Sequence, residues 1–162
     1  RVGNTTFAGL YYMILNRPVR RVKVKLEEDF LRYVSGIAGG QAVPALEALY
    51  DDFRSVNLDI RQRESGDIAT SLRAHEGGES AFLQSPFEEQ AGVIRTIFGD
   101  QLIFVHEDRE IQRLLEDGTE IVPNDPIIKA AHDGTVVFVE AFKHFGNCLA
   151  IDHGMGFSTV YA

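Results

Sequence analysis

Histidines are the residues of this chain best suited to acid–base or metal chemistry near neutral pH. None belongs to an H-x-H or H-E-x-x-H pair, and no C-x-x-C pair, G-x-S-x-G motif or phosphate loop occurs. Taken singly, each histidine is more typical of a surface residue or a hydrogen-bonded core residue than of a catalyst. The five are His75, His106, His132, His144 and His153.

The only cysteine, Cys148, lies in an apolar run and allows no internal disulfide. We interpret it as a small core residue.

The stretch VEAFKHF at residues 139–145 resembles the biotin-carrier signature E-A-M-K-M, with Lys143 at the modified position. Both methionines of that signature are absent, and so is a glycine-rich hairpin upstream. We favour a strand end that carries one lysine. A carrier module modified at Lys143 stays open as a hypothesis.

A longer block, DGTVVFVEAFKHFGNCLAIDHGMGFSTVYA at residues 133–162, resembles the lysostaphin-like, LytM-type zinc metallopeptidases that cut peptidoglycan peptides. In that family a DGxVVFAG strand precedes YGNxVxIDHGxGxxTxYAH. Two glycines of the block permit the positive φ of a tight hairpin turn. The resemblance implies that the family does not use the block's histidine as a zinc ligand, so we expect it to be structural. The motif residues are Asp152, His153, Gly154, Gly156 and Tyr161.

Family members carry H-x-G-x-D upstream of this block, and its His and Asp are zinc ligands. The matching segment here is EDGTEI, with Glu116 at the His position, Gly118 at the central glycine and Glu120 at the Asp position. A catalytic zinc needs three protein ligands and an open position for water. The resemblance therefore implies a degraded site, in which Glu116 and Glu120 replace ligands. The alternative is that both glutamates face solvent on a loop.

The family completes its site with an H-x-H strand and with a histidine after T-x-Y-A, and neither has a counterpart up to Ala162. We therefore expect a non-catalytic domain, without zinc of its own, that binds peptidoglycan or regulates a cell-wall hydrolase. The resemblance implies a bacterial cell-envelope location, periplasmic or extracytoplasmic, and an upstream membrane anchor. The alternative is an active zinc metalloendopeptidase that cleaves peptidoglycan cross-links, completed by residues beyond 162.

Composition limits other functions. The 162 residues carry a net charge of −8, with a pI near 5.1. A general nucleic-acid binder needs a basic face for the phosphates, so we expect no nucleic-acid partner. Hydrophobic residues make up 44% of the chain, which is enough for a packed core.

The sequence predicts an α+β chain that has three consecutive parts. Residues 1–26 predict a strand pair, since valines and lysines alternate in RVKVK, and the resemblance implies that this pair ends a preceding β-domain or forms a linker. Residues 27–78 predict a helical region, with a loop at 75–80. Residues 79–162 predict a small, mostly antiparallel β-domain, and the resemblance implies that it is of the LytM type (duplicated hybrid motif) and incomplete at its C-terminus.

Within the helical region, apolar residues from Phe30 to Ile37 recur at helical spacing, and two glycines at 39–40 predict the helix end. A second apolar stripe follows Pro44, with Asp51–Asp52 expected on its solvated face. A third, short helix is predicted with Ser65 or Asp67 as its cap. Further on, QLIFVHEDREI predicts a hairpin with its turn at Glu107–Asp108.

Overall fold

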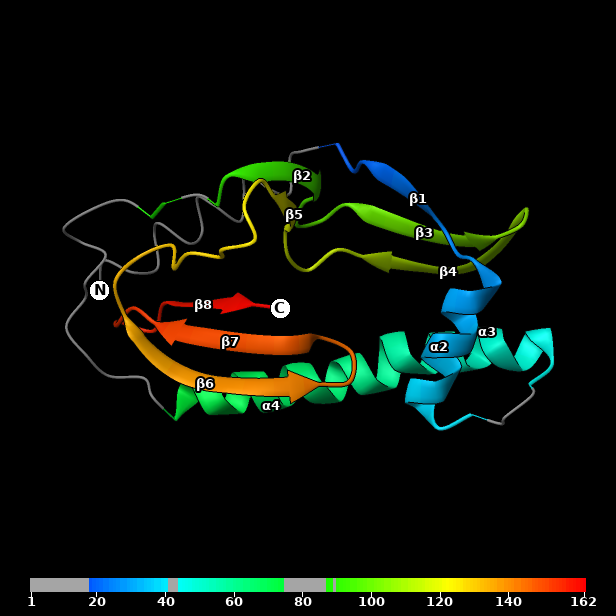
Figure 1. The fold of residues 1–162 in the computed structure, drawn as a ribbon, viewed down its shortest axis with the longest axis horizontal. Coiled ribbons are helices and arrows are strands. Elements are labelled where there is room, and N and C mark those ends of the chain that lie inside the picture. Colours follow the sequence, from blue (N-terminus) through cyan, green and yellow to red (C-terminus); the bar gives the residue numbers. More distant parts are fainter. Residues whose placement is uncertain (1–17, 41–43, 75–86, 89) are drawn as a thin grey trace. The chain divides into compact units, whose positions relative to one another are not determined.

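The computed structural model describes residues 18–40, 44–74, 87–88 and 90–162 (Figure 1). It contains helices and mostly antiparallel strands, which confirms the predicted α+β class. The chain forms two compact units, and each combines two separate stretches of sequence. The strand predicted before residue 18, the 75–80 loop and His75 lie outside the described residues.

The first unit joins residues up to Leu26 with residues 92–122. Its larger sheet has the order β1-β3-β4, in which β1 is parallel to β3 and β3 is antiparallel to β4. Two more strands, β2 and β5, form a separate sheet. The five strands are β1 (Arg21–Lys25), β2 (Gly92–Thr96), β3 (Gln101–His106), β4 (Arg109–Leu115) and β5 (Glu120–Pro123).

Two sequence predictions for this unit are confirmed. The RVKVK strand alternates between half-buried valines and exposed basic residues, because successive side chains of a strand point to opposite faces. The β3–β4 hairpin turns at Glu107–Asp108, where Glu107 takes a left-handed φ of 53°. The partner of β1 was not predicted: β1 joins a strand from the stretch assigned to the third part of the chain.

A buried carboxylate fastens β1 to this sheet. Asp100 is fully buried and accepts hydrogen bonds from the Arg20 Nε at 2.9 Å and from the Ile97 N–H at 3.1 Å. The Arg20 Nη2 also pairs with this carboxylate and donates to the Arg95 carbonyl oxygen at 2.8 Å. One arginine therefore connects the start of β1 to the turn that precedes β3.

The second unit joins residues 27–91 with residues 123–162. A helical hairpin pairs α2 with α3, and α3 continues through a π-helical segment, η1, into α4. The helix α2 ends as predicted, since Gly39 has φ 84° and its N–H caps the last turn. The helices are α2 (Glu28–Ala38), α3 (Leu46–Ser55), η1 (Val56–Ile60) and α4 (Arg61–Arg73).

The core of this helical layer is apolar and follows the predicted stripes. Both α2 and α3 bury one face, whereas Phe30 and Leu46 at the margins of the stripes are 47% and 40% exposed. The buried side chains are Leu31, Val34, Leu49, Tyr50, Phe53 and Val56.

Two predictions for the helices are wrong. No helix starts at Ser65 or Asp67, because the helix is already continuous from Leu46 and its earlier turns supply the hydrogen-bond acceptors. Asp52 does not lie on a solvated face, since it accepts a hydrogen bond from the Ser35 hydroxyl and so ties α3 to α2. Its neighbour Asp51 is exposed, as expected, and pairs with Arg54.

A three-stranded antiparallel sheet completes this unit, with β6 (Thr135–Phe142), β7 (Gly146–Asp152) and β8 (Ser158–Tyr161) in that order. The helix α4 packs against β6 (Figure 1). The central strand β7 is the most buried, since Cys148, Ala150 and Ile151 are all less than a tenth exposed. Among the described segments, no helix has both the length and the hydropathy of a membrane span.

We expect Asp100→Asn to destabilise the first unit. The substitution removes the charge that the Arg20 guanidinium pairs with, and hydrogen bonds to charged groups contribute about 1.5–3 kcal/mol. Because half of the Arg20 side chain is exposed to solvent, we expect the free energy of unfolding to fall by about 1.5 kcal/mol.

Native-state hydrogen exchange of the β3 amides measures this loss. Asp108→Asn, in the exposed β3–β4 turn, is the control and should change the same free energy by less than about 0.5 kcal/mol. Equal exchange in both variants would contradict the role given to Asp100.

Candidate functional site

The turn between β7 and β8 is organised around a buried histidine. His153 is 1% exposed, and its Nδ1 lies 2.8 Å from the Asp133 carbonyl oxygen. Because a carbonyl only accepts, this contact requires the proton on Nδ1. The Nε2 atom then accepts from the Thr159 hydroxyl at 2.9 Å. Both ring nitrogens are engaged within the protein, which supports the structural role expected for His153.

Glycines shape the same turn, as the sequence predicts. Gly154 and Gly156 have φ values of 85° and 77°, and Met155 between them also takes a positive φ of 54°. The Gly154 N–H donates to the Asp152 Oδ1 at 2.8 Å, so the motif aspartate closes the turn. The backbone conformation thus explains why two glycines flank a single side chain here.

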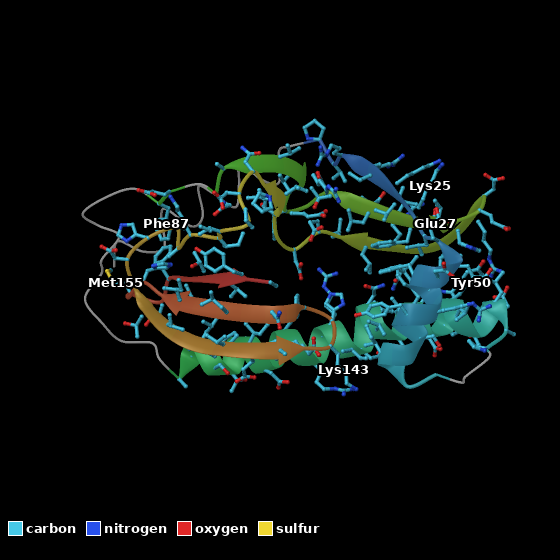
Figure 2. The ribbon with its side chains drawn as sticks, in the orientation of Figure 1. Lys25, Glu27, Tyr50, Phe87, Lys143 and Met155 are labelled. Carbon is cyan, nitrogen blue, oxygen red and sulfur yellow. The ribbon has the colours of Figure 1, made fainter. Side chains whose placement is uncertain are left out.

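Aromatic rings cover this end of the sheet. Phe87 lies edge-on to the His153 ring at a centroid distance of 5.0 Å and lies 5.3 Å from the ring of His132. Figure 2 shows Phe87 and Met155 at the same end of the sheet. The hydroxyl of Tyr161 accepts a hydrogen bond from the Ala131 N–H at 2.7 Å. The motif tyrosine therefore positions the segment that leads into β6.

The two glutamates at the family's ligand positions lie in the first unit. Glu116 directly follows β4, is half-buried, and its Oε2 accepts from the Thr96 hydroxyl at 3.0 Å. Glu120 begins β5, is exposed, and lies 3.5 Å from the Arg95 guanidinium. The alternative of two solvent-facing loop residues holds in part, since Glu116 lies in a loop but is half-buried, and Glu120 faces solvent but lies in a strand. Within the described residues, no group of three or more His, Cys, Asp or Glu could hold a metal ion.

Lys143 follows the last residue of β6 and is exposed, in the turn that leads to β7 (Figure 2). His144, beside it, packs edge-on against Phe145 with a centroid distance of 4.8 Å. His106 is buried in β3. The rings of His132 and His153 lie edge to face with their centroids 6.1 Å apart.

One buried polar residue of the second unit was not predicted from the sequence. Glu64, in α4, is 8% exposed, and its carboxylate accepts hydrogen bonds from the backbone of the β6–β7 turn. A glutamate in a polar stretch such as RQRESGD gives no periodic signal that distinguishes it from its exposed neighbours.

A hollow of about 360 Å³ lies between the segment around Gln90 and residues 124–130. The Gln90 side-chain oxygen accepts a hydrogen bond from the Lys129 N–H at 3.1 Å, which fixes one wall. Its lining contains both polar and apolar residues, and no buried side-chain nitrogen or oxygen of the described lining residues lacks a hydrogen-bond partner. The lining residues of this hollow indicate no particular class of ligand.

Comparison with known proteins adds no family. No protein-family model matches the chain, and no curated protein matches it significantly.

Gly134 lies in the 133–162 block at a position where the neighbouring atoms leave no room for a side chain. An added Cβ would lie 2.5 Å from the Asp152 carbonyl oxygen and 2.9 Å from the His153 Nδ1. Since backbone cannot yield, Gly134→Ala should destabilise this sheet by about 1–3 kcal/mol. Gly118→Ala is the matched control, because its Cβ meets nothing within 4 Å. Hydrogen exchange of the β7 amides distinguishes them, and equal protection would contradict this packing.

Burial also controls the single thiol. Desolvation raises the pKa of Cys148, and the negative charges of Glu140 and Glu64 raise it further. Since the thiolate is the reactive form, we expect alkylation by iodoacetamide to be at least about tenfold slower in the folded chain than in concentrated urea. Mass spectrometry over time measures both rates, and equal rates would show that the thiol is accessible.

Proposed function

We propose that the chain is a non-catalytic LytM-type domain of the bacterial cell envelope that binds peptidoglycan or regulates a cell-wall hydrolase. One observation carries the proposal: the 133–162 block that resembles this family forms a single β6-β7-β8 sheet, in which the motif residues Asp152, His153, Gly154 and Tyr161 form hydrogen bonds. Positive φ at Gly154 and Gly156 matches the turn that the resemblance requires.

The absence of catalysis is proposed from the ligand positions. Zinc would have to compete with Thr96 for the Glu116 carboxylate and with Arg95 for that of Glu120. A glutamate for aspartate replacement also moves the carboxylate by one methylene, more than the ~0.2 Å tolerance of a good metal site. A bound zinc would acidify its water and polarise the scissile carbonyl, and this chemistry is what the two substitutions weaken.

The test uses the gene product at its full natural length. It should sediment with purified sacculi, retain less than stoichiometric zinc after dialysis, and release no muropeptides. Gly134→Ala is the control for a folded sheet and should lose sacculus binding while Gly118→Ala keeps it. Release of cross-linked muropeptides together with one zinc per chain would replace the proposal by the active endopeptidase. Failure to sediment, and failure to stimulate cell-wall hydrolases in a sacculus-release assay, would reject both roles.

A further inference from the structure

The β6–β7 turn presents three consecutive backbone donors to one carboxylate. The Oε1 of Glu64 accepts from the Lys143 N–H at 2.7 Å. Its Oε2 accepts from the His144 N–H at 2.9 Å and from the Phe145 N–H at 3.4 Å. Successive N–H groups that converge in a turn form an anion-binding concavity. Here the anion is supplied by the helix α4.

The turn takes the place of a counter-ion for Glu64. Every hydrogen bond of this carboxylate within the described residues comes from the turn, and no described lysine or arginine forms an ion pair with it. A buried carboxylate is strongly unfavourable unless hydrogen bonds compensate for lost water. Without Glu64 these three N–H groups would bond to water or to another acceptor. The turn is therefore shaped to receive a carboxylate.

The helix that delivers Glu64 is lightly held. Of the 13 residues of α4, only Glu64 and Ile68 are buried. Gly66 lies between them and destabilises a helix interior by about 1 kcal/mol relative to alanine. A π-helical segment, η1, precedes α4, and such segments often mark hinges and functional sites. Release of this carboxylate would thus remove the hydrogen bonds that join α4 to the β6–β7 turn.

We propose that the Lys143–Phe145 turn is a carboxylate-binding site that Glu64 occupies in cis, and that a carboxylate on a peptide partner displaces Glu64 and frees α4 from β6. The turn also carries the exposed side chain of Lys143, a positive charge (Figure 2). The ligand class is a peptide carboxylate, either a C-terminal α-carboxylate or an acidic side chain. This site is independent of the proposed peptidoglycan function and holds whichever partner the domain has.

The test removes the Glu64 carboxylate from the turn and adds acetate as a replacement. In Glu64→Ala, sodium acetate at constant ionic strength should produce saturable ¹H–¹⁵N shifts of the three turn amides, and chloride should not. The α4 amides of this variant should also exchange faster than those of the unaltered chain. Asp67→Ala removes an exposed carboxylate from the same helix and is the matched control. At the acetate concentrations that saturate Glu64→Ala, this control and the unaltered chain should show no such shift, because Glu64 competes for the turn from within the chain.

Two further arms sharpen the result. N-acetylalanine and N-acetylglutamate α-amide present an α-carboxylate and a side-chain carboxylate, and the one with the lower half-saturation concentration identifies the source. If Glu64→Ala does not keep the fold, Glu64→Gln replaces it. A neutral amide competes less well for three N–H donors than a carboxylate, so acetate should still shift the turn amides. No saturable shift in a folded Glu64 variant, or equal shifts in Asp67→Ala, overturns the proposal.

Discussion

Closure of the two turns of the β6-β7-β8 sheet by buried polar side chains is the interaction on which the second unit depends. At one end of β7, His153 bonds the Asp133 carbonyl and the Thr159 hydroxyl. At the other end, Glu64 gathers the N–H groups of residues 143–145. Turn backbone that is shielded from water needs such partners. The apolar residues of β7 can stay buried because the polar groups at both of its ends are satisfied.

Local features of the fold were predictable from sequence because their causes are local. Period-2 alternation located β1, and helical spacing with a terminal glycine located α2. The positive φ of Gly154 follows from the absence of a Cβ. What periodicity cannot give is the partner of a strand, so the parallel pairing of β1 with β3 was missed. Nor does it reveal that Asp52 bonds to Ser35 across two helices.

The residues of the candidate site also differ in how far the sequence predicts them. The motif residues were found by resemblance, and the role expected for His153 agrees with its contacts. Glu116 and Glu120 were identified by position in a motif, which says nothing about the Thr96 hydroxyl that bonds to Glu116 or the Arg95 guanidinium that pairs with Glu120. Glu64 carries no motif at all, since its significance arises only when a turn about 80 residues later folds against it.

The pairing of β1 with β3 has a consequence for the order of events during synthesis. Arg20 and Asp100 are 80 residues apart, and all the helices of the second unit are made between them. Contacts of such separation form slowly, because a long loop must close before any bond rewards it. The hairpin of α2 and α3 can therefore fold on the ribosome before β3 has been synthesised, and β1 can pair with β3 only afterwards.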